Sequence, residues 1–264
     1  MSQSSTVDVI IPVFNGGRTI VSAINSVLSG QGSHLHKIIV VNDGSDDNTA
    51  ECVKSFANPL VELICTPNQG VAKARNLGIE KATADWVAFL DADDLWMPGK
   101  LDAQLQVAFK YGADFICGSG SAQNELKSSL ILPQSLAQGN FIVTSSVLVK
   151  RSLVQRMQPV FTPKMTFAED YLAWLKCVTL TKGYYIGEKH VEYSLSKHPR
   201  YHLGQIMLNI TRLNFEYARF LRNTEANWGK RYDLSWTLFK GSIRSVLSIV
   251  KRFVGAYGAS VNNK

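Results

Sequence analysis

Three carboxylates follow an apolar segment in the sequence DWVAFLDADDLWMP at residues 85–98. The apolar residues are typical of a buried strand, and they lead directly into Asp91, Asp93 and Asp94. Carboxylates this close repel one another, and a hard divalent cation such as Mg²⁺ or Mn²⁺, shared with substrate phosphates, commonly holds them together. The alternative is a solvated turn that caps a helix, because Asp favours both positions and Pro98 suits a first helical turn.

The rest of the amino-terminal half alternates between strand and helix patterns. Buried-strand patterns cover residues 7–14, 37–43, 61–65 and 85–90. A helical pattern follows each strand, and Ser45 or Asp46 can cap the second of these helices. Alternation at this spacing predicts an α/β fold, in which a mainly parallel, Rossmann-like sheet is flanked by helices on both faces.

Polar residues follow all four predicted strands. They lie in the turns 12–15, 68–70 and 91–94 and at Asp43. Because ligands bind at the carboxyl ends of parallel strands, we expect these residues to converge in one site.

The composition fits a folded domain of 264 residues with a substantial core. The amino terminus MSQSSTVD lacks the basic and then apolar character of a secretory signal, and no apolar run is long enough to cross a bilayer. We therefore expect a cytoplasmic protein. Its four cysteines are widely spaced, which argues against a disulfide framework or a zinc site.

Positive charge is concentrated at the carboxyl terminus. Residues 195–264 contain twelve Lys or Arg against three Asp or Glu, whereas the whole chain has a net charge of +7. Within 234–254, one helical face is apolar, formed by Phe239, Ile243, Val246, Val250 and Phe253. Basic residues occupy the side and rear of the same helix, namely Lys240, Arg244, Lys251 and Arg252.

Two interpretations of this helix stay open. It could lie on an anionic membrane surface, which would make the protein peripheral on the inner face of the cell membrane. Alternatively, its apolar face packs on the catalytic domain or on a second copy of the chain as a homo-oligomer. Nucleic acid is a poorer partner, because the segment has no recognised nucleic-acid-binding motif, and we expect none to bind.

Six spaced segments carry a resemblance to a known family. They are IIPVFN (10–15), IIVVNDGSDDNT (38–49), NQGVAKARNLGIEKA (68–82), FLDADDLWMPGKL (89–101), NFIVTSSVLVKR (140–151) and FAEDYLAWLK (167–176). In this order they resemble the family 2 glycosyltransferases, which are inverting enzymes with the GT-A fold. The resemblance covers about residues 7–198, is firmest up to Asp114 and is weak over 119–139.

The resemblance implies a domain organisation. Residues 1–114 would form the nucleotide-sugar-binding half of a GT-A domain, and residues 115–198 its acceptor-binding half. Residues 199–264 would form a helical, basic extension.

The implied reaction transfers a sugar of the hexose type from a UDP-sugar to a hydroxyl. The strand-end turn expected to line the base and ribose pocket consists of Pro12, Val13, Phe14 and Asn15. Asp43 matches the carboxylate that accepts a hydrogen bond from N3 of uracil, and Asn42 stands where many members have a second Asp. The alternative for Asp43 is an Asx-turn leading into the next helix.

The acidic cluster matches the family's DxD motif at Asp91, Ala92 and Asp93. Asp93 is the expected direct ligand of Mn²⁺ or Mg²⁺, and Asp91 reaches the ribose or the metal through water. Asp94 either caps the helix or fixes the ligand geometry. Gly70, which has no side chain, is expected to leave room for the nucleotide. Arg75 either holds the diphosphate or pairs with an acid of the DxD turn.

Glu169 and Asp170 match the family's ED motif at the start of a helical pattern. The match implies that Asp170 is the base for the acceptor hydroxyl and that Glu169 binds or orients the acceptor. Without the resemblance, two acids at a helix amino end would be read as favourable to the helix dipole. His198 is a further candidate metal ligand, although the segment YSLSKHPR departs from the family's YRxH pattern.

A glycan or polyprenyl-diphosphate-linked oligosaccharide would be the acceptor, as in bacterial exopolysaccharide or other cell-surface polysaccharide assembly. A sugar-1-phosphate nucleotidyltransferase is disfavoured, because the first strand-end loop reads PVFNGGRT rather than Gly-rich and basic. The remaining alternative is a non-catalytic, glycosyltransferase-like subunit that binds nucleotide sugar or scaffolds a membrane complex. Such a subunit should have lost the DxD or ED motif, and both are present.

Overall fold

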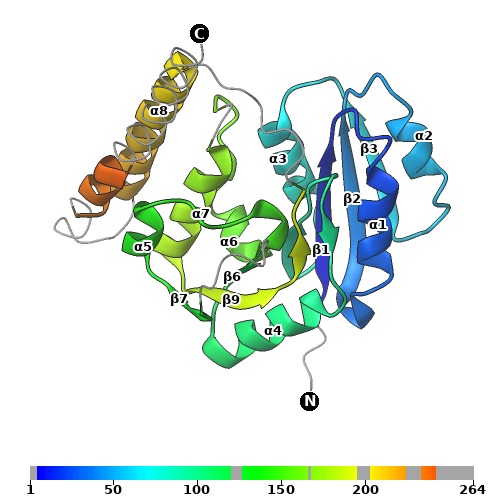
Figure 1. The fold of residues 1–264 in the computed structure, drawn as a ribbon, viewed down its shortest axis with the longest axis horizontal. Helices are drawn as coiled ribbons and strands as arrows, with labels where there is room; N and C mark the ends of the chain where they lie inside the picture. The colour runs from blue at the N-terminus through cyan, green and yellow to red at the C-terminus, as the bar shows by residue number, and fades with distance from the viewer. Residues whose placement is uncertain (1–4, 120–126, 166–167, 195–202, 224–232, 242–264) are drawn as a thin grey trace, which may run out of the picture. The chain divides into compact units, whose positions relative to one another are not determined.

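The computed structural model describes residues 5–119, 127–165, 168–194, 203–223 and 233–241 (Figure 1). The chain divides into two compact units. The first joins Met1–Ile131 with Ile142–His198, and the second joins Leu132–Phe141 with Pro199–Lys264. Every candidate site residue falls in the first unit, and the functional division at residues 114 and 198 stays a prediction.

The first unit contains an eight-stranded sheet with the order β3-β2-β1-β4-β8-β6-β9-β7. Four neighbouring strands pair in parallel: β1 (Val7–Val13), β2 (Leu35–Asp43), β3 (Val61–Thr66) and β4 (Trp86–Phe89). The remaining strands are β6 (Phe115–Ser119), β7 (Ser129–Ile131), β8 (Leu148–Lys150) and β9 (Gly183–Lys189). β8 is antiparallel to both β4 and β6, β9 is parallel to β6, and β7 is antiparallel to β9. The predicted mainly parallel sheet is confirmed.

Helices cover both faces of this sheet, and Figure 1 shows α1 (Ile20–Leu28) and α3 (Val71–Lys81) on opposite sides of β1. Every residue of β1 is buried, as expected for a central strand. Its residues Val7, Val9 and Ile11 pack in one core with buried residues of α1 and α4 (Lys100–Tyr111). Ile10 points to the other face, where it contacts α3 at Gly78.

Aromatic packing holds α7 (Glu169–Leu180) in place on this second face. The ring of Trp174 lies 5.7 Å from Phe89, 5.5 Å from Phe115 and 5.5 Å from Phe161, measured between centroids. Trp174 is fully buried, so α7 is anchored to the ends of both β4 and β6.

Short elements complete the first unit. They are α2 (Thr49–Lys54), α6 (Arg151–Gln155), the 3-10 turns η1 (Gly32–His34) and η2 (Thr144–Ser146), and the antiparallel pair β5 (Leu95–Trp96) and β10 (Val191–Glu192).

Two predicted helix caps are wrong. Neither Ser45 nor Asp46 caps α2, because the carboxylate of Asp47 accepts the hydrogen bond from the N–H of Thr49 (3.0 Å). Asp94 does not cap α4 either, since β5 intervenes and the cap residue is Gly99.

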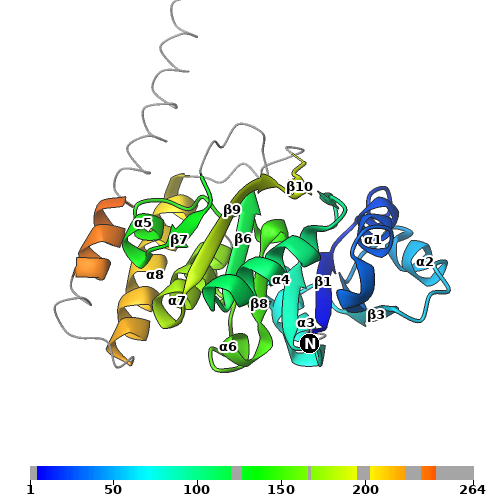
Figure 2. The same cartoon turned by 90° about the horizontal axis from the view of Figure 1, so that it is seen from below.

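The second unit is helical in its described parts. It contains α5 (Pro133–Ala137), α8 (Leu203–Arg222) and a helical segment at residues 233–241, drawn in orange in Figure 2. α8 buries Leu213, Tyr217 and Leu221 along one stripe. Among the described helices of both units, none combines the length and apolar character needed to cross a membrane.

We predict that Gly78→Ala destabilises the first unit. A Cβ atom at residue 78 would lie 2.4 Å from Cγ2 of Ile10, and this fully buried side chain has little room to move. Overpacking of this kind typically costs about 1–3 kcal/mol, which exceeds the gain in helix propensity. Urea denaturation should show this loss, whereas Gly139→Ala should be nearly neutral because a Cβ there meets nothing within 4 Å. Equal stability of the two variants would contradict the tight contact between α3 and β1.

Candidate functional site

The turn after β1 is firmly held. Pro12 and Val13 belong to β1 itself, and Phe14 follows with its side chain half exposed. Asn15 has a φ of 51°, in the left-handed region that Asn tolerates better than most residues. Its backbone N–H donates a hydrogen bond to Oγ of Ser45 (2.9 Å), which joins the loops after β1 and β2.

Asp43, the last residue of β2, is buried and ties this strand to the 68–70 turn. One carboxylate oxygen accepts hydrogen bonds from the backbone N–H of Gln69 (2.9 Å) and the hydroxyl of Thr66 (3.3 Å), and the other accepts from Gly70 N–H (2.7 Å). Gly70 has a φ of 92°, a conformation that favours glycine. The predicted residues Asp43 and Gly70 are therefore in direct contact.

The Asx-turn considered for Asp43 is made by its neighbour. The side-chain oxygen of Asn42 accepts a hydrogen bond from the backbone N–H of Ser45 (3.0 Å). Asn42 thus shapes the turn, and Asp43 is left to hold the 68–70 turn.

The DxD residues form the turn after β4. Asp91 and Ala92 are partly buried, whereas the side chain of Asp93 is exposed. Burial raises the pKa of Asp93, and the nearby charge of Asp91 raises it further. The two carboxylates therefore repel each other, as the sequence predicted.

Asp94 supports this turn from beneath. It is 1% exposed and accepts hydrogen bonds from the hydroxyl of Ser145 and from the backbone N–H of Ser194 (2.8 Å). Ser145 also accepts from the backbone N–H of Asp91 (3.0 Å), and its carbonyl accepts from the indole N–H of Trp96 (2.7 Å). Of the two predicted roles for Asp94, the structure supports fixing the geometry of the turn.

Arg75 lies between the two acidic motifs. Its Nη2 donates to Oδ1 of Asp91 (2.7 Å), and its Nη1 donates to Oε1 of Glu169 (2.9 Å). The guanidinium is 5.3 Å from the ring centroid of Phe161, and the residue is 5% exposed. The ion pair with an acid of the DxD turn is therefore present.

The ED residues begin α7, after Ala168 in the left-handed conformation (φ 61°). Oδ2 of Asp170 accepts a hydrogen bond from the hydroxyl of Thr144 (3.1 Å), and its Oδ1 accepts from the N–H of Tyr171 (2.6 Å). Burial raises the pKa of Asp170, while Arg75 and these hydrogen bonds oppose the shift. Burial also raises the pKa of Glu169, and the charge of Asp170 adds to that effect.

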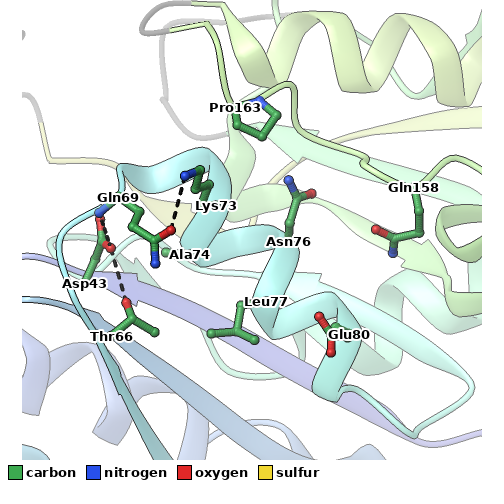
Figure 3. Close-up of a pocket in the computed structure, with 10 residues that line it drawn as sticks. All are labelled: Asp43, Thr66, Gln69, Lys73, Ala74, Asn76, Leu77, Glu80, Gln158 and Pro163. Carbon is green, nitrogen blue, oxygen red and sulfur yellow. Dashed lines mark hydrogen bonds between the residues drawn. The ribbon is translucent and has the colours of Figure 1, made fainter.

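A pocket of about 320 Å³ opens beside Asp43 along the outer face of α3 (Figure 3). Its lining includes Thr66, Gln69, Lys73 and Leu77, and the ammonium of Lys73 donates to Oε1 of Gln69 (3.1 Å). Asp43 is the only predicted nucleotide-binding residue among the residues that line it.

Comparison with known families and proteins decides the family. The model of the family described as "Glycosyl transferase family 2" matches residues 8–166, which is more than half of the chain. The chain is a family 2 glycosyltransferase. This assignment identifies the protein as an enzyme and confirms the resemblance of the six sequence segments.

Several bacterial relatives of this glycosyltransferase have similar sequences. An Escherichia coli protein, "UDP-Glc:alpha-D-GlcNAc-diphosphoundecaprenol beta-1,3-glucosyltransferase WfgD", is 29% identical over 177 residues, covering 64% of this chain and 68% of that protein. A second relative is the "Putative teichuronic acid biosynthesis glycosyltransferase TuaG" of Bacillus subtilis.

 
Over 202 residues the identity to TuaG is 29%, which covers 72% of this chain and 79% of that protein. An uncharacterized glycosyltransferase of Haemophilus influenzae is 32% identical over 187 residues, covering 67% of this chain and 73% of that protein.

Solved structures show that the enzyme has the GT-A fold. S. aureus TarS 1–349 in complex with UDP-GlcNAc superimposes with a TM-score of 0.75 at 17% identity, covering 89% of this chain and 72% of that one. The mannosyltransferase PcManGT from Pyrobaculum calidifontis, in complex with GDP-Man and Mn²⁺, gives a TM-score of 0.67 at 19% identity, covering 100% and 82%. The predicted fold class is confirmed.

Among the described residues, no three His, Cys, Asp or Glu side chains form a cluster that could hold a metal ion. The residues nevertheless fit a cation shared with a diphosphate, which needs only one or two carboxylates. Asp93 is exposed at the turn and is repelled by Asp91. His198, the third predicted ligand, lies outside the described residues.

Three residues that contact the candidate site residues were not predicted from the sequence: Thr144, Ser145 and Ser194. Thr144 and Ser145 belong to NFIVTSSVLVKR, a segment that carried the family resemblance but was given no role. A matched segment with consecutive hydroxyl residues was therefore the available signal. Ser194 contributes its backbone N–H to Asp94, for which the sequence offers no signal.

We predict that Asp94 makes the enzyme less stable as the pH rises. Burial raises the pKa of Asp94 to about 6 in the folded protein, from an ordinary value of 3.8. The folded state therefore holds this proton more tightly, and the free energy of unfolding should fall between these pH values by roughly 3 kcal/mol at most. Urea denaturation in EDTA should show that Asp94→Asn lacks this part of the pH dependence.

Glu80→Gln provides the control, because Glu80 is an exposed carboxylate on α3. This variant should keep the wild-type pH dependence. An unchanged pH dependence in Asp94→Asn would show that Asp94 is not buried as described.

Proposed function

We propose that the enzyme transfers a sugar from a UDP-sugar to a hydroxyl of a glycan or polyprenyl-diphosphate-linked acceptor, with inversion at the anomeric carbon. The observation that carries this proposal is that one guanidinium joins the DxD turn, at Asp91, to the ED helix, at Glu169. The names of WfgD and TuaG support a role in bacterial cell-surface polysaccharide biosynthesis. The presence of both motifs favours catalysis over a scaffold role.

The uridine would bind between the turn after β1 and the turn at residues 68–70. Phe14 offers an exposed ring beside this position, and Asn15 holds the turn. Oδ1 of Asp43 already accepts two hydrogen bonds, but Oδ2 accepts from Gly70 N–H and keeps a lone pair that can accept from N3 of uracil. Cytosine has no N3 proton, which would make the site selective for UDP over CDP.

A divalent cation, Mn²⁺ or Mg²⁺, would be held by Asp93 and, directly or through water, by Asp91. When bound, it would neutralise negative charge that grows on the departing diphosphate. The support from this chain is the repulsion between these carboxylates, and the structure of PcManGT with Mn²⁺ supports the same choice in a protein of this fold.

Asp170 would act as the base. Its two oxygens are oriented by Thr144 and by the N–H of Tyr171, and each retains a lone pair for the acceptor hydroxyl. As the acceptor oxygen bonds to the anomeric carbon, the bond to the diphosphate breaks and the hydroxyl proton passes to Asp170. Attack from the face opposite the diphosphate inverts the anomeric carbon. Glu169 would orient the acceptor while paired with Arg75.

Calorimetric titration with UDP and CDP, each with Mn²⁺ and with EDTA, tests the donor site. We expect UDP binding that requires metal and excludes CDP. Asp93→Ala should lose this binding because the cation loses its protein ligand. Asp102→Asn, which changes a half-exposed carboxylate on α4, should keep it. Equal binding of CDP would overturn the role of Asp43, and absence of any nucleotide binding would favour the scaffold alternative.

Asp170→Asn tests the base in the same samples. Transfer from UDP-glucose or UDP-GlcNAc to a lipid-linked GlcNAc-diphosphate acceptor should fall by about 10²- to 10⁴-fold, the contribution expected of a positioned base. UDP affinity should be nearly unchanged, because Asp170 contacts the acceptor rather than the nucleotide. Normal turnover in this variant would remove Asp170 from the mechanism.

A membrane-carried acceptor would place the enzyme in the cytoplasm, peripheral to the inner face of the cell membrane. In the helical segment 233–241, Trp236 and Phe239 are each 44% exposed and their rings stack at 5.6 Å. The ammonium of Lys240 lies 5.1 Å from the Trp236 ring centroid. Exposed aromatic and basic side chains are typical of a membrane-surface helix. Phe239 is the only member of the predicted apolar face within the described residues, since 243–253 lie outside them.

We predict that the double variant Trp236→Ser, Phe239→Ser binds anionic vesicles at least about tenfold more weakly, because it loses two interfacial rings. Co-sedimentation with phosphatidylglycerol-containing vesicles measures this loss. Phe109→Ser, which removes a 49% exposed ring from α4, is the matched control and should bind normally. Equal binding by all three proteins, or equal binding to neutral vesicles, would contradict the membrane role and favour packing on a second subunit.

A further inference from the structure

Arg75 uses its two terminal nitrogens on two different parts of the site. Nη2 donates to Asp91, which follows β4, and Nη1 donates to Glu169, the first residue of α7. These partners lie 16 and 94 residues away along the chain. The arginine fork therefore joins segments that are distant in sequence.

Each partner of Arg75 is adjacent to a residue with a proposed chemical role. Asp91 begins the turn that contains Asp93, and Glu169 directly precedes Asp170. One guanidinium thus bonds directly to both the donor turn and the base helix. A shift of about 1 Å between reacting groups can lower the rate by roughly 10²-fold, so this connection affects catalysis directly.

Direct binding of the donor diphosphate is the competing role for Arg75. Its side chain is only 6% exposed, and both terminal nitrogens are already bonded to carboxylates. The Nε–H, which takes part in neither ion pair, is buried and has no hydrogen-bond partner among the described residues. Each terminal nitrogen has a second N–H, but at 6% exposure the guanidinium offers a diphosphate little accessible surface while both ion pairs are in place.

We propose that Arg75 is a positioning residue that fixes the DxD turn and the ED helix relative to each other, and that it acts through Asp91 and Glu169 rather than by contact with the donor. The inference rests on the proposed function for its catalytic consequence. The connection itself is a property of the protein without ligand.

Amide hydrogen exchange of the ligand-free protein tests the connection directly. In Arg75→Met, exchange should rise in both the 89–97 and the 168–176 segments, because each loses a hydrogen-bond partner. The matched control is Lys81→Met, which removes an exposed cation from the same helix and should change neither segment. A rise confined to α3 would overturn the proposal.

Kinetics of the double variant Arg75→Met, Glu169→Gln tests the mode of action. If Arg75 acts through Glu169, the double variant should be no slower than Arg75→Met alone. If Arg75 instead binds the diphosphate, the two losses should multiply, and Arg75→Met should weaken binding of UDP far more than binding of UMP. Either of these results would overturn the positioning role.

If Arg75→Met fails to fold, the same hydrogen-exchange measurement can be made on Arg75→Lys. Lysine keeps the charge but cannot bond two carboxylates with a fork, so at least one of the two segments should still exchange faster than in the wild type. Wild-type exchange in both segments would overturn the proposal. Absence of transfer by the wild-type enzyme would count against the proposed function alone, because the exchange measurement needs no substrate.

Discussion

Carboxylates that approach one another away from bulk water need a cation or hydrogen bonds, and this constraint governs the active edge of the sheet. Arg75 is the cation for Asp91 and Glu169, and the hydroxyl of Ser145 donates a hydrogen bond to Asp94. Breaking a buried ion pair typically costs about 3–5 kcal/mol, because the remaining charge is left uncompensated. The DxD turn, α3 and α7 therefore have one compatible arrangement rather than several.

Core packing gives this arrangement its rigidity. The helix α3, which carries Arg75, approaches β1 closely because residue 78 is glycine. The helix α7, which carries Asp170, is anchored by the packing of Trp174. Both helices lie on the same face of the sheet, and the polar contacts form at their amino-terminal ends or near them. The charged groups are thus placed by apolar contacts that do not themselves change during a reaction.

Local patterns predicted much of the fold and part of the site. Asp43 and Asp91 follow apolar strands, and the strand-end rule alone brings them to one edge. Ser145 could not be found in this way, because it precedes β8, a strand of only three residues with no readable periodicity. The pairing of Arg75 with Glu169 was equally hidden, since helical periodicity says nothing about a partner 94 residues away. Both omissions concern contacts between the two halves of the sheet.

The antiparallel direction of β8 has a consequence for how the protein is made. Its first residue, Leu148, pairs with Ala88 near the end of β4, so the chain just before β8 reaches the DxD turn. Ser145 is synthesised 51 residues after Asp94. Asp94 therefore leaves the ribosome before Ser145, its hydrogen-bond donor, has been made. The turn therefore acquires its final hydrogen bonds only after the acceptor half has entered the sheet. Recombination that exchanged the two halves between family members would have to preserve this late contact.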